Sequence, residues 1–70
     1  MNDDEKELLA AMLAAPASEI DKMEPATVGK CKDYLGLDGL YEPQVHYPLV
    51  LAKLRRQWAQ AMLAEARGKP

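Results

Sequence analysis

Apolar residues recur every three or four positions near the start of the chain, which is the period of one face of an α-helix. This run predicts an amphipathic helix over residues 4–15. The proline at position 16 should end the helix, because proline has no amide N–H to continue the backbone hydrogen bonds. The apolar face of this helix is formed by Leu8, Leu9, Met12 and Leu13.

Two further helical segments are expected before the middle of the chain. Ser18, with an acidic residue three positions later, is typical of a capping box and predicts a short helical turn over residues 18–23. Proline is tolerated at the first position of a helix, so Pro25 predicts the start of a helix over residues 25–35. Gly36 is placed to end that helix in the left-handed conformation.

The segment 37–47 has the least regular pattern. Proline disfavours helix in the residue before it, and prolines stand at positions 43 and 48. The segment therefore predicts an ordered loop that carries tyrosines and prolines. A last helix is expected over residues 48–67, about 30 Å long. Its main apolar stripe is formed by Leu51, Leu54, Trp58 and Met62.

These segments predict an all-α protein: a small bundle of three main helices and one short helical turn, in a single domain over residues 1–70, with the long C-terminal helix as its spine. A second line on that helix carries alanines seven residues apart, which would let another helix approach closely. The two shorter helices cannot cover this line as well as the main stripe. We therefore expect a homodimer with antiparallel copies of the long helix, and an interface of Ala52, Ala59, Leu63 and Ala66.

Charge is distributed unevenly along the chain, although the net charge is only −2. Residues 1–24 carry seven acidic and two basic side chains, whereas residues 48–70 carry five basic and one acidic. The two ends could attract each other within the fold or across a dimer, or the basic end could meet phosphates. The single cysteine, the acidic N-terminus and the lack of a transmembrane-length apolar run favour a cytoplasmic protein with no membrane partner.

Catalytic and metal-binding chemistry find little support in the residue types. The chain has one histidine, His46, and one cysteine, Cys31, which lies on the apolar stripe of its helix. Nucleophilic catalysis needs a nucleophile with a nearby base, and zinc usually needs three or four ligands. No glycine-rich phosphate loop occurs. We expect a non-enzymatic protein without cofactor or metal.

The aromatic and basic residues are better candidates for binding a partner. Tyrosine and tryptophan are common at the energetic centres of protein interfaces, and two tyrosines flank the proline loop. The densest basic cluster lies on the last helix. The sequence therefore predicts a small protein–protein interaction module, an adaptor, inhibitor or regulator of the kind that bacteria and phages encode. The expected partner-binding residues are Tyr41, His46, Tyr47, Arg55 and Arg56.

An alternative function comes from a resemblance. Residues 8–37, and especially Pro25-Ala26-Thr27-Val28 followed by Leu35-Gly36-Leu37, resemble a helix-turn-helix unit. In that family the second helix of the pair enters the major groove of DNA. The resemblance implies a DNA-binding domain, or a subunit of a DNA-handling complex. The residues that would then face DNA are Thr27, Lys30 and Lys32.

Overall fold

The computed structural model describes residues 2–68, and these residues form four α-helices and no strand. The helices are α1 (Asp3–Leu13), α2 (Ala17–Met23), α3 (Val28–Leu35) and α4 (Pro43–Arg67). The predicted all-α class, with a long C-terminal helix as its spine, is confirmed. The 25 residues of α4 span about 37 Å at the rise of an α-helix, and this helix sets the longest dimension of the molecule, 42 Å.

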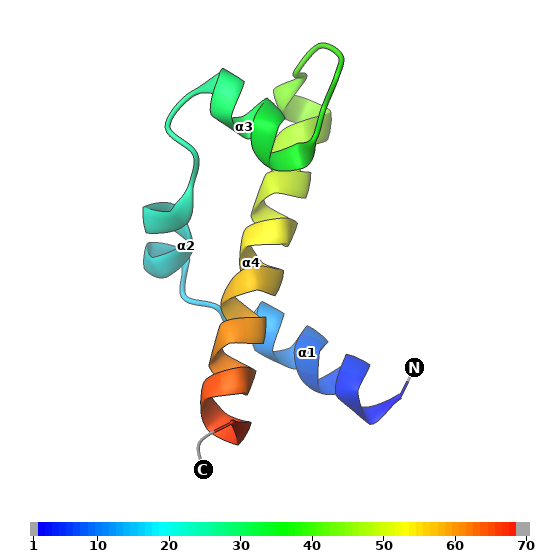
Figure 1. Cartoon of the computed structure of the whole chain (residues 1–70), viewed down its shortest axis with the longest axis vertical. Coiled ribbons are helices and arrows are strands. Elements are labelled where there is room, and N and C mark those ends of the chain that lie inside the picture. The colour runs from blue at the N-terminus through cyan, green and yellow to red at the C-terminus, as the bar shows by residue number, and fades with distance from the viewer. Residues whose placement is uncertain (1, 69–70) are drawn as a thin grey trace.

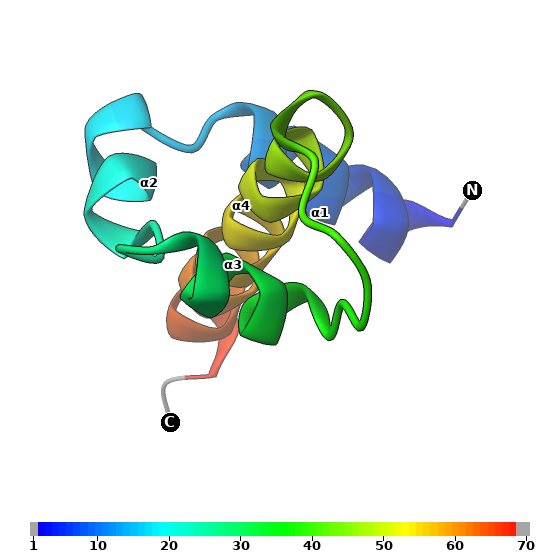
Figure 2. The ribbon, with the colours of Figure 1, turned by 90° about the horizontal axis from the view of Figure 1, so that it is seen from above.

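The three shorter helices are arranged around α4 (Figure 1). The backbones of α1, α2 and α3 each pack against α4 and do not pack against one another. Viewed from above, α1, α2 and α3 occupy different sides of the central helix (Figure 2). The fold therefore depends on α4, because each short helix can bury its apolar face only there.

The first half of the chain follows local rules at most helix ends. The Asn2 side chain caps α1 by accepting a hydrogen bond from the Glu5 amide at 2.8 Å. Gly36 takes a φ of +66° after α3, and the Leu37 amide donates to the Lys32 carbonyl at 2.9 Å. This is the predicted glycine-ended helix terminus, in which the left-handed residue lets the chain turn back over the last carbonyls.

Several predicted helix bounds differ from the structure. α1 covers Asp3–Leu13 and not residues 4–15, so it ends two residues earlier than expected. α2 begins at Ala17, before the expected cap Ser18, because the Glu19 and Ile20 amides already donate to the Pro16 carbonyl. The third helix begins at Val28 and not at 25. Its N-cap is Thr27, whose hydroxyl accepts a hydrogen bond from the Lys30 amide at 3.1 Å.

The largest difference lies at α4, which begins at Pro43, five residues earlier than expected. Pro43 occupies the first helical position, where a missing amide N–H costs nothing. His46 Nδ1 then accepts a hydrogen bond from the Glu42 amide at 2.8 Å and so satisfies a donor at the helix start. Pro48 lies inside the helix and removes one backbone bond, and the helix continues past it. The predicted loop 37–47 is therefore shorter than expected.

The core lies where α4 meets α2 and α3. Its buried members are Ala15, Ile20, Cys31, Val50 and Leu54. Partly buried residues pack around them, namely Met23, Tyr34, Leu35, Tyr41, Leu51 and Trp58. Ala59 is also fully buried, outside this cluster. So small a core leaves many large apolar side chains of the described chain in contact with solvent.

Candidate functional site

Two of the expected partner-binding residues, Tyr41 and His46, come together at the start of α4. Their rings stack with centroids 5.7 Å apart and planes 29° from parallel. The His46 ring also holds the Glu42 amide. Burial raises the pKa of Tyr41, and a side-chain hydrogen bond with Cys31 adds to the rise. Both side chains therefore take part in ordering the turn before α4, and both are partly buried.

The third residue at this end, Tyr47, connects α4 to the segment after α2. Its hydroxyl donates a hydrogen bond to the Glu24 carboxylate. That hydrogen bond raises the pKa of Tyr47, because the neutral phenol is the form that can donate. Desolvation and the nearby charges of Glu24 and Asp21 act in the same direction. We call Tyr41, His46 and Tyr47 the tyrosine end of the molecule, and all three side chains make contacts within the chain.

The tyrosines give a testable pH dependence. The pKa values of Tyr34, Tyr41 and Tyr47 are all raised above the ordinary 10.0. When folding raises the pKa of a group, its stabilisation of the folded protein is complete at pH values below the pKa of the unfolded state. This stabilisation is lost as the pH rises through the pKa of the folded state. We expect phenolate absorbance of the native protein to rise at higher pH than in denaturant. Equal midpoints for native and denatured protein would contradict these contacts.

The basic cluster expected on the last helix is divided by its surroundings. Lys53 and Arg56, three residues apart, lie on one side of α4, and Arg55 lies on another. Lys53 Nζ donates a hydrogen bond to the Tyr34 carbonyl at 2.5 Å. The same nitrogen lies 4.5 Å from the centre of the Tyr34 ring, which is a cation–π contact. Arg55 is partly buried, whereas Arg56 is exposed. Arg56 lines a hollow of the surface.

The opposite charges of the two chain ends meet within the fold. Arg67, in the last turn of α4, forms ion pairs with Glu7 and, at 3.8 Å, with Asp4 of α1. Of the alternatives left open by the charge pattern, attraction within the chain is therefore observed for this residue. Arg67 also suits the negative end of the α4 dipole.

The geometry expected of a helix-turn-helix unit is not formed. In such a unit the two helices pack against each other, so that one supports the other in the groove. Here α2 and α3 pack only against α4. The Thr27 hydroxyl caps α3, Lys30 is exposed and Lys32 is partly buried. The resemblance is therefore wrong about how these helices are arranged.

The expected dimer line is not one continuous exposed face. Ala52 and Ala66 are exposed, but Ala59 has an exposed fraction of 0% within the single chain. Leu63 is partly buried and lines a hollow together with Leu8 of α1. The expectation that the short helices leave Ala59 uncovered is wrong, because Ala59 is fully buried. Its neighbours on the same helix face, Arg56 and Leu63, line hollows together with residues of α1, which packs against α4.

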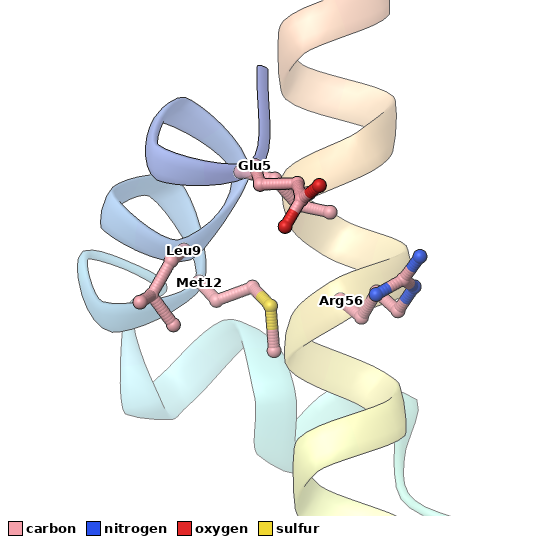
Figure 3. A pocket seen from close by; sticks show the side chains of 5 residues that line it. Glu5, Leu9, Met12 and Arg56 are labelled. Carbon is pink, nitrogen blue, oxygen red and sulfur yellow. The ribbon is translucent and has the colours of Figure 1, made fainter. Parts of the chain in front are cut away.

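The structure instead forms a hollow of about 480 Å³ between α1 and α4. Figure 3 shows Glu5, Leu9 and Met12 of α1 on one side and Arg56 of α4 on the other. Leu8 completes the lining. The α1 side of the hollow thus carries apolar residues and an acidic one, and the α4 side carries a basic residue.

An exposed apolar stripe of α4 leads into this hollow. Val45, Leu49 and Ala52 are exposed and follow one another at spacings of four and three, and Arg56 comes four residues later. Residues at these spacings share one helix face. On α1, Leu9 and Leu13 are four apart and also exposed. We define the α1–α4 surface as the hollow together with these exposed positions: Glu5, Leu8, Leu9, Met12, Leu13, Val45, Leu49, Ala52 and Arg56.

Sequence reasoning missed most of this surface. The sequence predicts Val45 within the loop 37–47, because the prolines at 43 and 48 disfavour helix in the residues before them, whereas the structure places Val45 in α4. The spacing from Val45 to Arg56 is visible in the sequence, and Pro43 at a first helical position was the available signal for it.

The described residues contain no group of three or more His, Cys, Asp or Glu side chains that could hold a metal ion. Among the helices of that part of the chain, none has the length and apolar character needed to span a membrane. Comparison with protein-family models, with curated proteins and with solved structures finds no match to this chain.

Proposed function

We propose that this protein is a small, non-catalytic protein–protein interaction module, an adaptor, inhibitor or regulator, that binds its partner through the α1–α4 surface. The observation that supports the proposal is the apolar character of this exposed surface. Leu13 is 73% exposed, Val45 56% and Leu49 52%. Single exposed apolar residues are ordinary, but exposed apolar residues that recur along one face of a helix and on the helix packed against it are typical of a binding surface.

The shape and chemistry of the surface fit a helix of another chain. A groove between two helices can accept the apolar face of a third, with contacts three or four residues apart. Burial of apolar area stabilises such a complex by about 25 cal/mol per Å² before the costs of association. Glu5 and Arg56, at the walls of the hollow, would select the orientation and charge of the partner.

The tyrosine end is the weaker candidate for the interface. Tyr41, His46 and Tyr47 already bond or stack within the chain. An interface there would have to leave these contacts in place or break them. The exposed Leu40, beside this end, makes a suitable control position outside the α1–α4 surface.

The proposal is tested by capture of the partner with tagged protein from cells of the source organism. We expect Leu49→Glu to abolish capture, because it places a charge in the apolar stripe. Leu40→Glu, at a residue that is 79% exposed, should capture as well as the unchanged protein. Nuclease treatment should leave capture intact.

Two results would refute the proposal. Equal capture by Leu49→Glu and the unchanged protein would remove the α1–α4 surface from the interaction. Loss of capture on nuclease treatment, with steep salt dependence of binding to duplex DNA, would instead support the DNA-binding alternative.

A further inference from the structure

We propose that the occupant of the α1–α4 surface is a second copy of this chain, related by a twofold axis that passes through the hollow between α1 and α4. The inference rests on the proposed function, since it names what binds the same surface. It differs from the dimer expected from the alanine line, because Ala59 is buried within the single chain. Three observations support it: surface area, charge and the exposed apolar residues on both helices.

The single chain is more extended than its length requires. Its radius of gyration is 13.7 Å, whereas a compact domain of this length has about 11 Å. Its accessible surface is 5112 Å², against about 4400 Å² for a compact monomer of this mass. The excess, about 700 Å², is close to the roughly 800 Å² that each partner buries in a standard interface. One partner of ordinary size would therefore cover the excess.

The charges of the hollow are complementary to their own twofold copy. Glu5 and Arg56 lie on opposite walls. Within residues 2–68 neither side chain forms an ion pair or a side-chain hydrogen bond. A twofold axis through the centre of the hollow exchanges its walls, so Arg56 of each copy comes to face Glu5 of the other. One symmetric contact would thus pair all four charges.

The apolar residues around the charges suit the same arrangement. The axis that exchanges the walls brings α1 of each copy to face α4 of the other. Leu13 of α1 and Leu49 of α4, both more than half exposed, would then be covered by the other copy. Binding of an unrelated helix would not by itself explain why the acidic Glu5 and the basic Arg56 lie on opposite walls of the hollow.

The test uses charge reversal on the full-length protein, followed by sedimentation equilibrium. Both positions are exposed, so Glu5→Arg and Arg56→Glu should keep the circular dichroism spectrum of the unchanged protein. We expect the unchanged protein to dimerise at tens of micromolar. Each variant alone would bring like charges together twice, and its dimer dissociation constant should rise about tenfold or more.

The decisive arm mixes the two variants. A chain with arginine at both positions should pair with a chain with glutamate at both positions, so an equimolar mixture should form a heterodimer. The double variant, with both reversals in one chain, should dimerise again by itself. If association is restored both in the mixture and in the double variant, residue 5 of one copy must face residue 56 of the other.

Several results would overturn the inference. The unchanged protein could be a monomer at tens of micromolar, or the single variants could dimerise as tightly as the unchanged protein. A mixture that stays monomeric would also exclude the twofold pairing. If the unchanged protein is a monomer but Leu49→Glu still abolishes capture of another protein, the proposed function stands and only the second copy is excluded.

Discussion

Ala59→Glu should destabilise the protein by about 3 kcal/mol or more. The larger glutamate side chain has no space at this position, and its charge would be removed from water. Ala59 is fully buried. Its neighbours on the same face, Arg56 and Leu63, line hollows together with residues of α1. The added carboxylate must therefore displace α1 or carry its charge into the contact between α1 and α4. Chemical denaturation, followed by circular dichroism at low protein concentration, measures the loss.

Ala66→Glu is the matched control for this substitution. Ala66 lies seven residues further along the same helix, has the same small side chain and is exposed. We expect a change within about 0.5 kcal/mol there, as for other surface substitutions. Equal stability of the two variants would show that α1 does not cover Ala59. The sequence pattern alone would have predicted the opposite, a stable but monomeric Ala59 variant.

Leu54→Ala should cost about 3 kcal/mol through lost apolar burial and the cavity left behind. Leu54 has an exposed fraction of 2% and is one of the largest fully enclosed side chains in the core cluster. A 70-residue protein has a total stability of about 4–10 kcal/mol. The variant should therefore unfold at a much lower denaturant concentration, and a part of it should be unfolded without denaturant.

The control for this variant is Leu40→Ala. The same atoms are removed, but Leu40 is among the most exposed apolar residues of the described chain. We expect its denaturation midpoint to stay close to that of the unchanged protein. Similar losses at both positions would mean that α4 does not carry the core where the structure places it.

Much of the fold could be predicted because it depends on short stretches of sequence. The apolar spacing of α1 and α4 and the glycine at position 36 are local signals, and the structure confirms both helices and the glycine-ended terminus. The predicted apolar faces are only partly buried, since Leu9, Leu13 and Met62 are exposed. Proline was misjudged in two places. Pro25 was expected to start a helix, but the Thr27 hydroxyl offers a better cap. Pro43 does start one, because His46 satisfies the Glu42 amide and Tyr41 stacks on His46.

The candidate binding surface was harder to predict, because it depends on how α1 crosses α4. Ala52 lies four residues before Arg56 and Ala59 three residues after it. No local pattern determines that Ala59 is buried while Ala52 stays exposed. The alanines do recur at the spacing of one helix face. They do not form one exposed line, because Ala59 is buried whereas Ala52 and Ala66 are exposed. Tyr41, His46 and Tyr47 are predicted from the sequence to bind a partner, and the contacts that the structure shows for them lie within the chain.

The central claim is that the α1–α4 surface binds protein, and backbone amide chemical shifts of isotope-labelled protein test it most directly. The shifts would be compared before and after binding, either of a second copy on raising the concentration or of the captured partner. We expect the changes to gather at Leu9, Leu49, Ala52 and Arg56, with little change at Leu40 and Tyr47. Changes centred on Leu40 and Tyr47, with none along the exposed stripe of α4, would contradict the claim.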